Sequence, residues 1–171
     1  MLEALWLTAG LVMGCGGTSM SEQTLDQRDR RYGRTIDTLG VEARLPASAA
    51  RIWTVLPSAF ADLGLEINFR EPATKRVGAC YQQVHGRLGR ELLSTYVDCG
   101  DSRSVPNADR FEVGMTVLIT VVSTGEETAK VYTFVIGVGD DVASSNAKVW
   151  CHSTGALEER IQRLIAERIA G

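Results

Sequence analysis

Two long stretches of alternating apolar and polar residues constrain the fold of this chain more than any other feature. In residues 111–122, every second side chain is apolar: Val113, Met115, Val117, Ile119 and Val121. Residues 128–138 repeat the alternation with Tyr132, Phe134, Ile136 and Val138. Period two is typical of a β-strand with one buried face, and the five residues between the stretches (STGEE) suit a hairpin turn. The sequence therefore predicts a long antiparallel hairpin with an apolar face that other elements must cover.

Two amphipathic helices are predicted to cover that face. The first spans residues 48–63, with Ser48 as its N-cap and Gly64 as its stop. Its apolar stripe consists of Ile52, Trp53, Leu56, Phe60 and Leu63. The second follows Ser153 or Thr154, either of which would cap it. Its stripe consists of Leu157, Ile161, Leu164, Ile165 and Ile169.

Shorter extended segments complete the pattern at residues 39–45, 65–70, 75–84, 92–99 and 148–151. The order β-α-β-β-β-β-α is typical of an α+β domain. We expect one helix-grip-like domain over residues 39–171, with an antiparallel sheet of four to six strands and both helices on one face. Trp53 and Phe60 are the expected core anchors, and Tyr132 and Phe134 are expected to help fill the space between helices and sheet.

The first 38 residues differ from this domain in composition. Residues 4–13 (ALWLTAGLVM) are apolar or small, but a membrane-spanning helix needs roughly 20 such residues. Residues 16–38 are rich in Gly, Ser and charge and have few apolar side chains to offset the entropy of ordering. This arrangement favours a signal peptide over residues 1–14 rather than a short buried helix. Residues 15–38 would then be a flexible tether.

Val12-Met13-Gly14-Cys15 resembles a bacterial lipobox. In proteins with that motif, the signal is cleaved before the cysteine, which then carries a diacylglyceryl thioether and an amide-linked acyl chain. The resemblance implies lipidation at Cys15, and two or more acyl chains anchor a protein stably. Because Gly16 rather than Asp follows, resemblance to the sorting rule of diderm bacteria favours the outer membrane, with the domain facing the periplasm. Plain secretion and a cytosolic location are the alternatives.

The segment LPASAARIWTVLPSAFADLGLEINFRE (residues 45–71) resembles the opening of domains in the outer-membrane assembly lipoprotein BamC. Those domains also place an Ile-Trp or Val-Trp pair, a mid-helix Leu-Pro and a terminal Leu-Gly on a helix after a strand. The resemblance implies a helix-grip fold and an accessory role in outer-membrane assembly. The second half, with CG at 99–100, PNAD at 106–109 and CHSTGALE at 151–158, looks more like uncharacterised bacterial lipoproteins of similar size.

Three cysteines follow Cys15, at positions 80, 99 and 151. In an exported domain they share an oxidising compartment and permit three pairings. We favour Cys99–Cys151, because each of these residues lies where a predicted strand ends. Cys80 would then be a small buried hydrophobic residue. The alternative is three reduced cysteines in the core.

Few residues suggest catalysis or cofactor binding. The net charge of −3 argues against general nucleic-acid binding, and no C-x-x-C motif is present. His85 and His152 are the only histidines, and in an extended segment His152 points away from its neighbour Cys151. Asp140-Asp141 are expected to form a solvated loop pair. We therefore predict no catalytic residues, no metal and no cofactor.

Three functions are compatible with these features. The first is a non-enzymatic envelope lipoprotein that binds another protein through a sheet edge or a helix face. The second is a carrier for a small apolar ligand, which the expected filling of the core disfavours. The third is a periplasmic enzyme without a recognisable motif.

Overall fold

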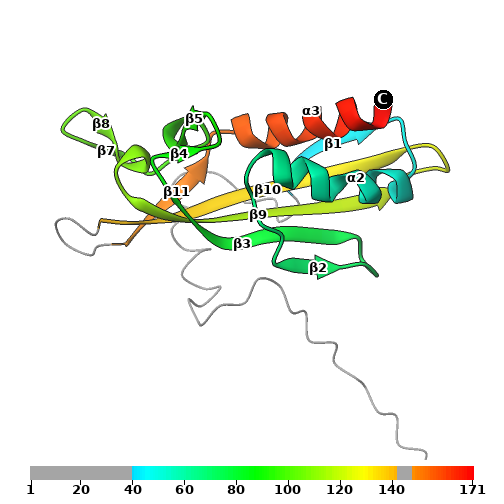
Figure 1. Ribbon diagram of the computed structural model, residues 1–171, viewed down its shortest axis with the longest axis horizontal. Coiled ribbons are helices and arrows are strands. Elements are labelled where there is room, and N and C mark those ends of the chain that lie inside the picture. The colour runs from blue at the N-terminus through cyan, green and yellow to red at the C-terminus, as the bar shows by residue number, and fades with distance from the viewer. Residues whose placement is uncertain (1–39, 142–147) are drawn as a thin grey trace, which may run out of the picture. The chain divides into compact units, whose positions relative to one another are not determined.

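The computed structural model describes residues 40–141 and 148–171, and their fold is α+β, as the sequence predicts (Figure 1). A mostly antiparallel sheet carries two long helices on one face. The elements, in chain order, are β1 (Val41–Leu45), α2 (Ala49–Asp62), β2 (Phe69–Glu71), β3 (Arg76–His85), β4 (Arg87–Leu88), β5 (Glu91–Leu92), η2 (Leu93–Thr95), β6 (Val97–Asp98), β7 (Asp101–Ser102), β8 (Val105–Pro106), η3 (Asn107–Asp109), β9 (Glu112–Ser123), β10 (Ala129–Asp140), β11 (Lys148–Ser153) and α3 (Ala156–Ala170).

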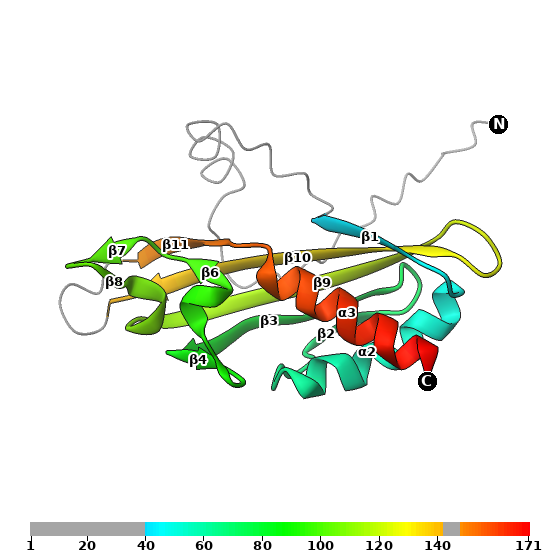
Figure 2. The same cartoon turned by 90° about the horizontal axis from the view of Figure 1, so that it is seen from above.

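The main sheet has seven strands, more than the four to six expected, in the order β2-β3-β9-β10-β11-β6, with β1 also paired to β10. One edge of β10 pairs with β9 along its whole length. The other edge is shared, because β1 pairs with residues 129–133 and β11 with residues 136–140. The strand predicted over residues 92–99 is instead the 3-10 turn η2 followed by the two-residue β6. Figures 1 and 2 show the small β7-β8 hairpin at the end of the sheet away from the β9–β10 turn.

The predicted alternation of β9 is confirmed, but the predicted burial of β10 is wrong. Val113, Met115, Val117, Ile119 and Val121 are all buried on the face that α2 and α3 cover, here called the inner face. The register pairs Val117 with Val135 and Val121 with Val131. The buried set of β10 is therefore Ala129, Val131, Thr133 and Val135. Tyr132, Phe134, Ile136 and Val138 alternate with these residues, so they lie half-buried on the opposite, outer face.

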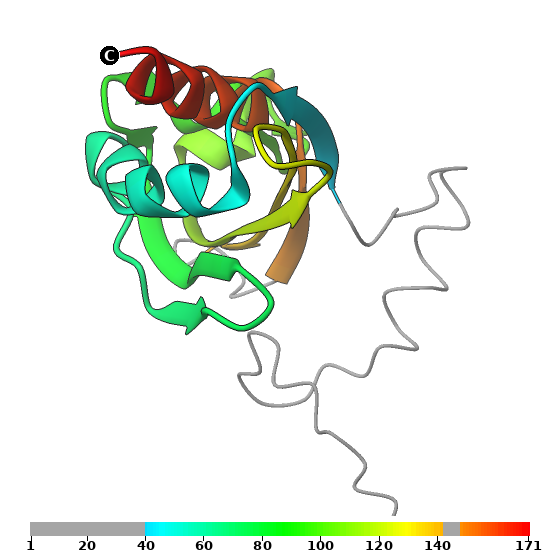
Figure 3. The same ribbon diagram turned by 90° about the vertical axis from the view of Figure 1, so that its right-hand side faces the viewer.

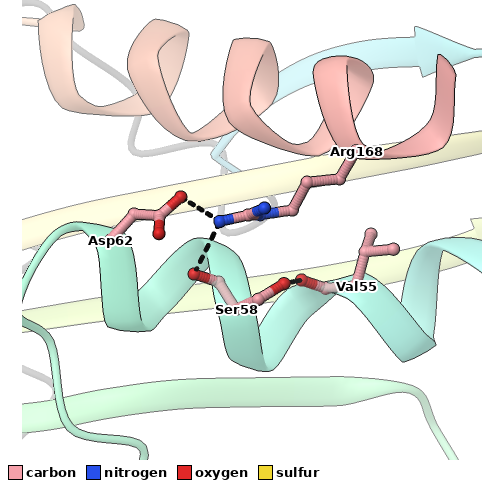
Figure 4. A network of polar contacts seen from close by, with 4 residues as sticks. All are labelled: Val55, Ser58, Asp62 and Arg168. Atoms are coloured by element: carbon pink, nitrogen blue, oxygen red, sulfur yellow. Dashed lines mark hydrogen bonds and ion pairs between the residues drawn. The ribbon is translucent and has the colours of Figure 1, made fainter. Parts of the chain in front are cut away.

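The two helices lie side by side over the inner face (Figures 2 and 3). Ser48 is the N-cap of α2, as predicted, and its Oγ accepts a hydrogen bond from the Arg51 backbone N at 3.3 Å. At the helix–helix contact, Arg168 of α3 donates to the Asp62 carboxylate and to the Ser58 carbonyl of α2 (Figure 4). Arg51 of α2 donates in return to the Ile169 carbonyl of α3 at 2.5 Å. These bonds link the helices at the solvent side of their contact.

The start of α3 differs from the prediction. Its N-cap is Gly155, with a φ of +90°, rather than Ser153 or Thr154. The two hydroxyls still contribute, because Ser153 Oγ accepts from Gly155 N at 2.9 Å and Thr154 Oγ1 accepts from Ala156 N at 3.3 Å. The side chains of Ser153 and Thr154 therefore bind backbone N–H groups just before the helix. Gly155 supplies the left-handed backbone conformation at the N-cap position.

Side chains fill the space between the helices and the sheet. The largest fully buried helix residues are Ile52, Leu56, Phe60, Leu157, Ile161 and Ile165. Phe60 is thus a core residue, as expected. Trp53 is only partly buried and packs against the core, with the Arg70 guanidinium 5.1 Å from the centroid of its ring. Tyr132 and Phe134 do not contribute to this space, because they lie on the outer face.

Candidate functional site: the outer face of the sheet

The outer face of the sheet carries an apolar belt, opposite the two helices. Strand register aligns its members in neighbouring rows across the strands. Phe69, Leu118 and Phe134 share one row, with Gly78 between Phe69 and Leu118. Val138 and Trp150 are directly opposite each other in another row, and Ile136 lies between the two rows. We call these residues the outer belt, and all of them are half-buried: Phe69, Leu118, Phe134, Ile136, Val138 and Trp150.

Charged side chains bound the outer belt at both ends. Toward the β9–β10 turn lie Glu42, Arg44, Glu71, Arg76 and Lys130, and toward the other end lie Glu112, Asp140 and Lys148. Asp98 adds a fifth acidic group opposite His152, in the row of Ile136, so acidic groups outnumber the four basic ones by one when the two histidines are neutral. The Lys130 ammonium lies 2.9 Å from the Glu42 carboxylate. This hydrogen bond holds the pKa of Glu42 below its usual value and raises the pKa of Lys130.

The chain enters the domain at the edge of the outer belt. Gly40 adopts a φ of +76° and lies so close to β10 that a Cβ there would be 2.3 Å from the Thr133 carbonyl oxygen. α3 lies along the inner side of the next strand, where Gln162 Nε2 donates to the Val41 carbonyl at 3.2 Å. The described part of the chain therefore begins beside Phe134, at the edge of the outer belt.

Cys99 and Cys151 form a disulfide, the pairing that the sequence favours. Their Cα atoms are 4.1 Å apart, and the bond continues the pairing of β6 with β11 on the inner side. Gly137 and Gly139 make room for it within β10. A Cβ at Gly139 would lie 3.2 Å from Cys151 Sγ, and one at Gly137 would lie 3.2 Å from Cys151 Cβ. Gly139 therefore belongs to β10, which extends two residues beyond the alternating stretch that the sequence shows over residues 128–138.

Cys80 differs from its expectation as a buried free thiol. It is half-buried and is not free. It lies at the irregular part of β3, where the register with β9 shifts between Ala79 and Gln82 and Tyr81 adopts a φ of +53°. The Asn68 side chain brackets its backbone with two hydrogen bonds, accepting from Cys80 N at 2.7 Å and donating to Cys80 O at 2.8 Å.

Glu158 is a buried carboxyl that the sequence does not single out. It lies in the first turn of α3, where its side chain is 3 % exposed, and its Oε2 has no hydrogen-bond partner. Burial raises its pKa, and a hydrogen bond with Ser153 opposes this effect. An acidic side chain in a first turn is a usual helix feature, so only its burial makes it unusual.

The two histidines lie on the surface, whereas Asp140, expected in a solvated loop, is the half-buried last residue of β10. His85 and His152 are both exposed, and strand pairing places them opposite Glu112 and Asp98. His152 and the buried Cys151 are on opposite faces, as predicted. Across the two described ranges, no cluster of three or more His, Cys, Asp or Glu side chains could hold a metal ion. Cys15, with the predicted signal peptide and tether, lies outside these ranges.

Comparisons with protein-family models, with curated proteins and with solved structures found no match for this chain. In the part of the chain that the structure describes, no helix has the length and apolar character needed to cross a bilayer.

Proposed function

We propose that this chain is a lipid-anchored protein of the bacterial envelope whose domain has a binding or structural role rather than a catalytic one. The anchor is Cys15, within the lipobox-like sequence of residues 12–15. The observation that carries the binding role is the outer belt, because six large apolar side chains on one sheet face lie opposite both helices. Contiguous partly exposed apolar surface of this kind marks interaction sites.

Two further observations support this function. The Cys99–Cys151 disulfide suits an oxidising compartment such as the periplasm. The filled core also favours recognition at the surface over capture of a ligand between helices and sheet, since Phe60, Leu56 and Ile161 are at most 2 % exposed.

The anchor is tested by metabolic labelling with a fatty-acid analogue in a diderm bacterium. We expect the wild-type chain to be labelled and to fractionate with membranes, and Cys15→Ala to lose both properties. Ser19→Ala is the matched control, because it changes a neighbouring residue of the same segment, keeps Cys15 and should keep the label. Equal labelling of the Cys15→Ala variant would contradict the anchor.

The finer proposal is an accessory role in outer-membrane assembly, which rests on the resemblance of residues 45–71 to BamC domains. Its test is crosslinking in the native envelope with a photoreactive amino acid at exposed Ala61 on α2, within the segment that carries the resemblance. The matched control places the same group at Phe134 in the outer belt. Recovery of barrel-assembly components from position 61 but not 134 is the expected result. Their absence from both would contradict the role.

A further inference from the structure

We propose that the outer belt rests against the bilayer that holds the anchor, so that the sheet lies on the lipid surface and the helices face away from it. This inference rests on the proposed lipid anchor at Cys15. It adds an orientation and a second, non-covalent contact with lipid.

The first observation behind this orientation is the position of Gly40. The described chain begins at Gly40, which packs against the backbone of Thr133 and Phe134 in β10. A lipid on Cys15 would therefore hold the domain at a point beside Phe134 of the outer belt. An entry point on the helix layer would instead lie on the side opposite to the outer belt.

The chemistry of the outer belt carries the second step. Phe69, Phe134 and Trp150 are aromatic, and Leu118, Ile136 and Val138 are aliphatic. Aromatic rings, Trp above all, favour the boundary between headgroups and acyl chains. Most charged residues lie at the two ends of the belt, and Asp98 lies at its β6 edge. Since basic groups do not exceed acidic ones, the outer face does not favour anionic lipid, and a zwitterionic bilayer is the fitting partner.

The length of the connecting chain carries the third step. As a flexible coil, residues 16–38 would have an end-to-end distance of about 25–30 Å. A connection of that length holds the domain at an effective concentration on the order of millimolar near the surface. A face that binds lipid only weakly by itself would therefore be occupied for much of the time.

Trp150 provides a direct test, with Trp53 as its matched control. The sequence has three tryptophans, and Trp6 is removed with the predicted signal peptide. Trp150 lies on the outer face, and Trp53 is on α2 beneath Arg70. The lipidated protein is placed in phosphatidylcholine vesicles with brominated acyl chains. We expect the Trp53→Phe variant, which keeps Trp150, to lose at least half of its emission. The Trp150→Phe variant, which keeps Trp53, should lose little.

Vesicle flotation separates failure of the orientation from failure of the anchor. If both variants float and Trp150 remains unquenched, the orientation is wrong and the anchor is retained. If neither variant floats, the anchor fails and the orientation fails with it. Iodide quenching in buffer without detergent or lipid tests whether a second copy of the chain covers the outer belt instead. Shielding of Trp150 that grows with protein concentration would assign the outer belt to a second copy of the chain and overturn the proposal.

Discussion

At the scale of single residues, Gly40 and Gly64 have similar backbone conformations but different surroundings, so substitutions at the two positions separate backbone strain from steric clash. Both have positive φ values, +76° and +69°, which glycine adopts more readily than other residues. A Cβ at Gly64 would meet nothing within 4 Å, whereas one at Gly40 would collide with the backbone of Thr133. We expect Gly64→Ala to cost about 1 kcal/mol from backbone strain and Gly40→Ala about 2–4 kcal/mol. Urea denaturation measures both, and equal losses would contradict the close packing of Gly40 on β10.

Glu158 makes stability depend on pH in a defined direction. Its raised pKa means that the folded protein holds a proton that the unfolded chain releases near pH 4.5. The free energy of unfolding should therefore fall as the pH rises through the interval between these two pKa values. Glu158→Gln removes this titration, so we expect its stability relative to wild type to increase from pH 4 to pH 8.

Glu167 is the matched control for this effect, since it lies on the same helix but is exposed. Glu167→Gln changes the net charge equally and should keep the pH dependence that Glu158 gives the wild type. Chemical denaturation at pH 4, 6 and 8 compares the variants. A difference between Glu158→Gln and wild type that stays constant over this range would count against the buried carboxyl.

At the scale of elements, the Cys99–Cys151 disulfide joins β6 to β11 across a sequence separation of 52 residues. On the chain-entropy model, closing a loop of this size stabilises a protein by about 4 kcal/mol. We expect the double variant Cys99→Ala/Cys151→Ala to lose about that amount. The double change avoids leaving a single reactive thiol. The midpoint of urea denaturation is the measurement, and a loss below about 1 kcal/mol would contradict a stabilising role.

The elements also show what the sequence could predict. Ser48 sets the start of α2, because its hydroxyl is a strong N-cap. β9 is predictable because every second residue is apolar and polar residues such as Glu112 and Thr116 lie between them. In β10, the residues that point to one face of the sheet and those that point to the other are both largely apolar. Pattern alone favours the bulkier set that contains Phe134, but the inner face takes Val131 and Val135 instead. The register with β9 decides this choice, and a one-residue shift exchanges the faces.

For the same reason, the sequence does not predict the outer belt. With Phe134 and Ile136 in the core, the other side of β10 would carry the smaller Val131 and Val135 and no aromatic side chain. The close approach of Gly40 to Thr133 depends on contacts between residues distant in the sequence, so no local pattern predicts it. The pairing of Cys99 with Cys151 is correctly predicted although its stated reason holds only in part, because Cys99 follows β6 directly but β11 continues past Cys151 to Ser153.

At the scale of the whole molecule, the anchor and the outer belt should act together. A protease recognition sequence inserted between Arg34 and Thr35 allows the domain to be cut from its lipid on vesicles. We expect most of the domain to leave the vesicles after cleavage, because the belt alone binds weakly without the effective concentration that the tether supplies. Flotation before and after cleavage measures the released fraction. A domain that stays bound would show that the face holds the membrane without the lipid.

The entry of the chain at Gly40 also determines how the domain would respond to force. A pull on the chain ahead of Gly40 would reach the fold at the first residue of β1, a strand of five residues that pairs with β10. Because that end of β1 is loaded first, the ladder would open from Val41 toward Leu45, one residue pair at a time. β1 is therefore the element that would detach first under tension. Tension would detach it while the β9–β10 hairpin and the disulfide-linked strands remain folded.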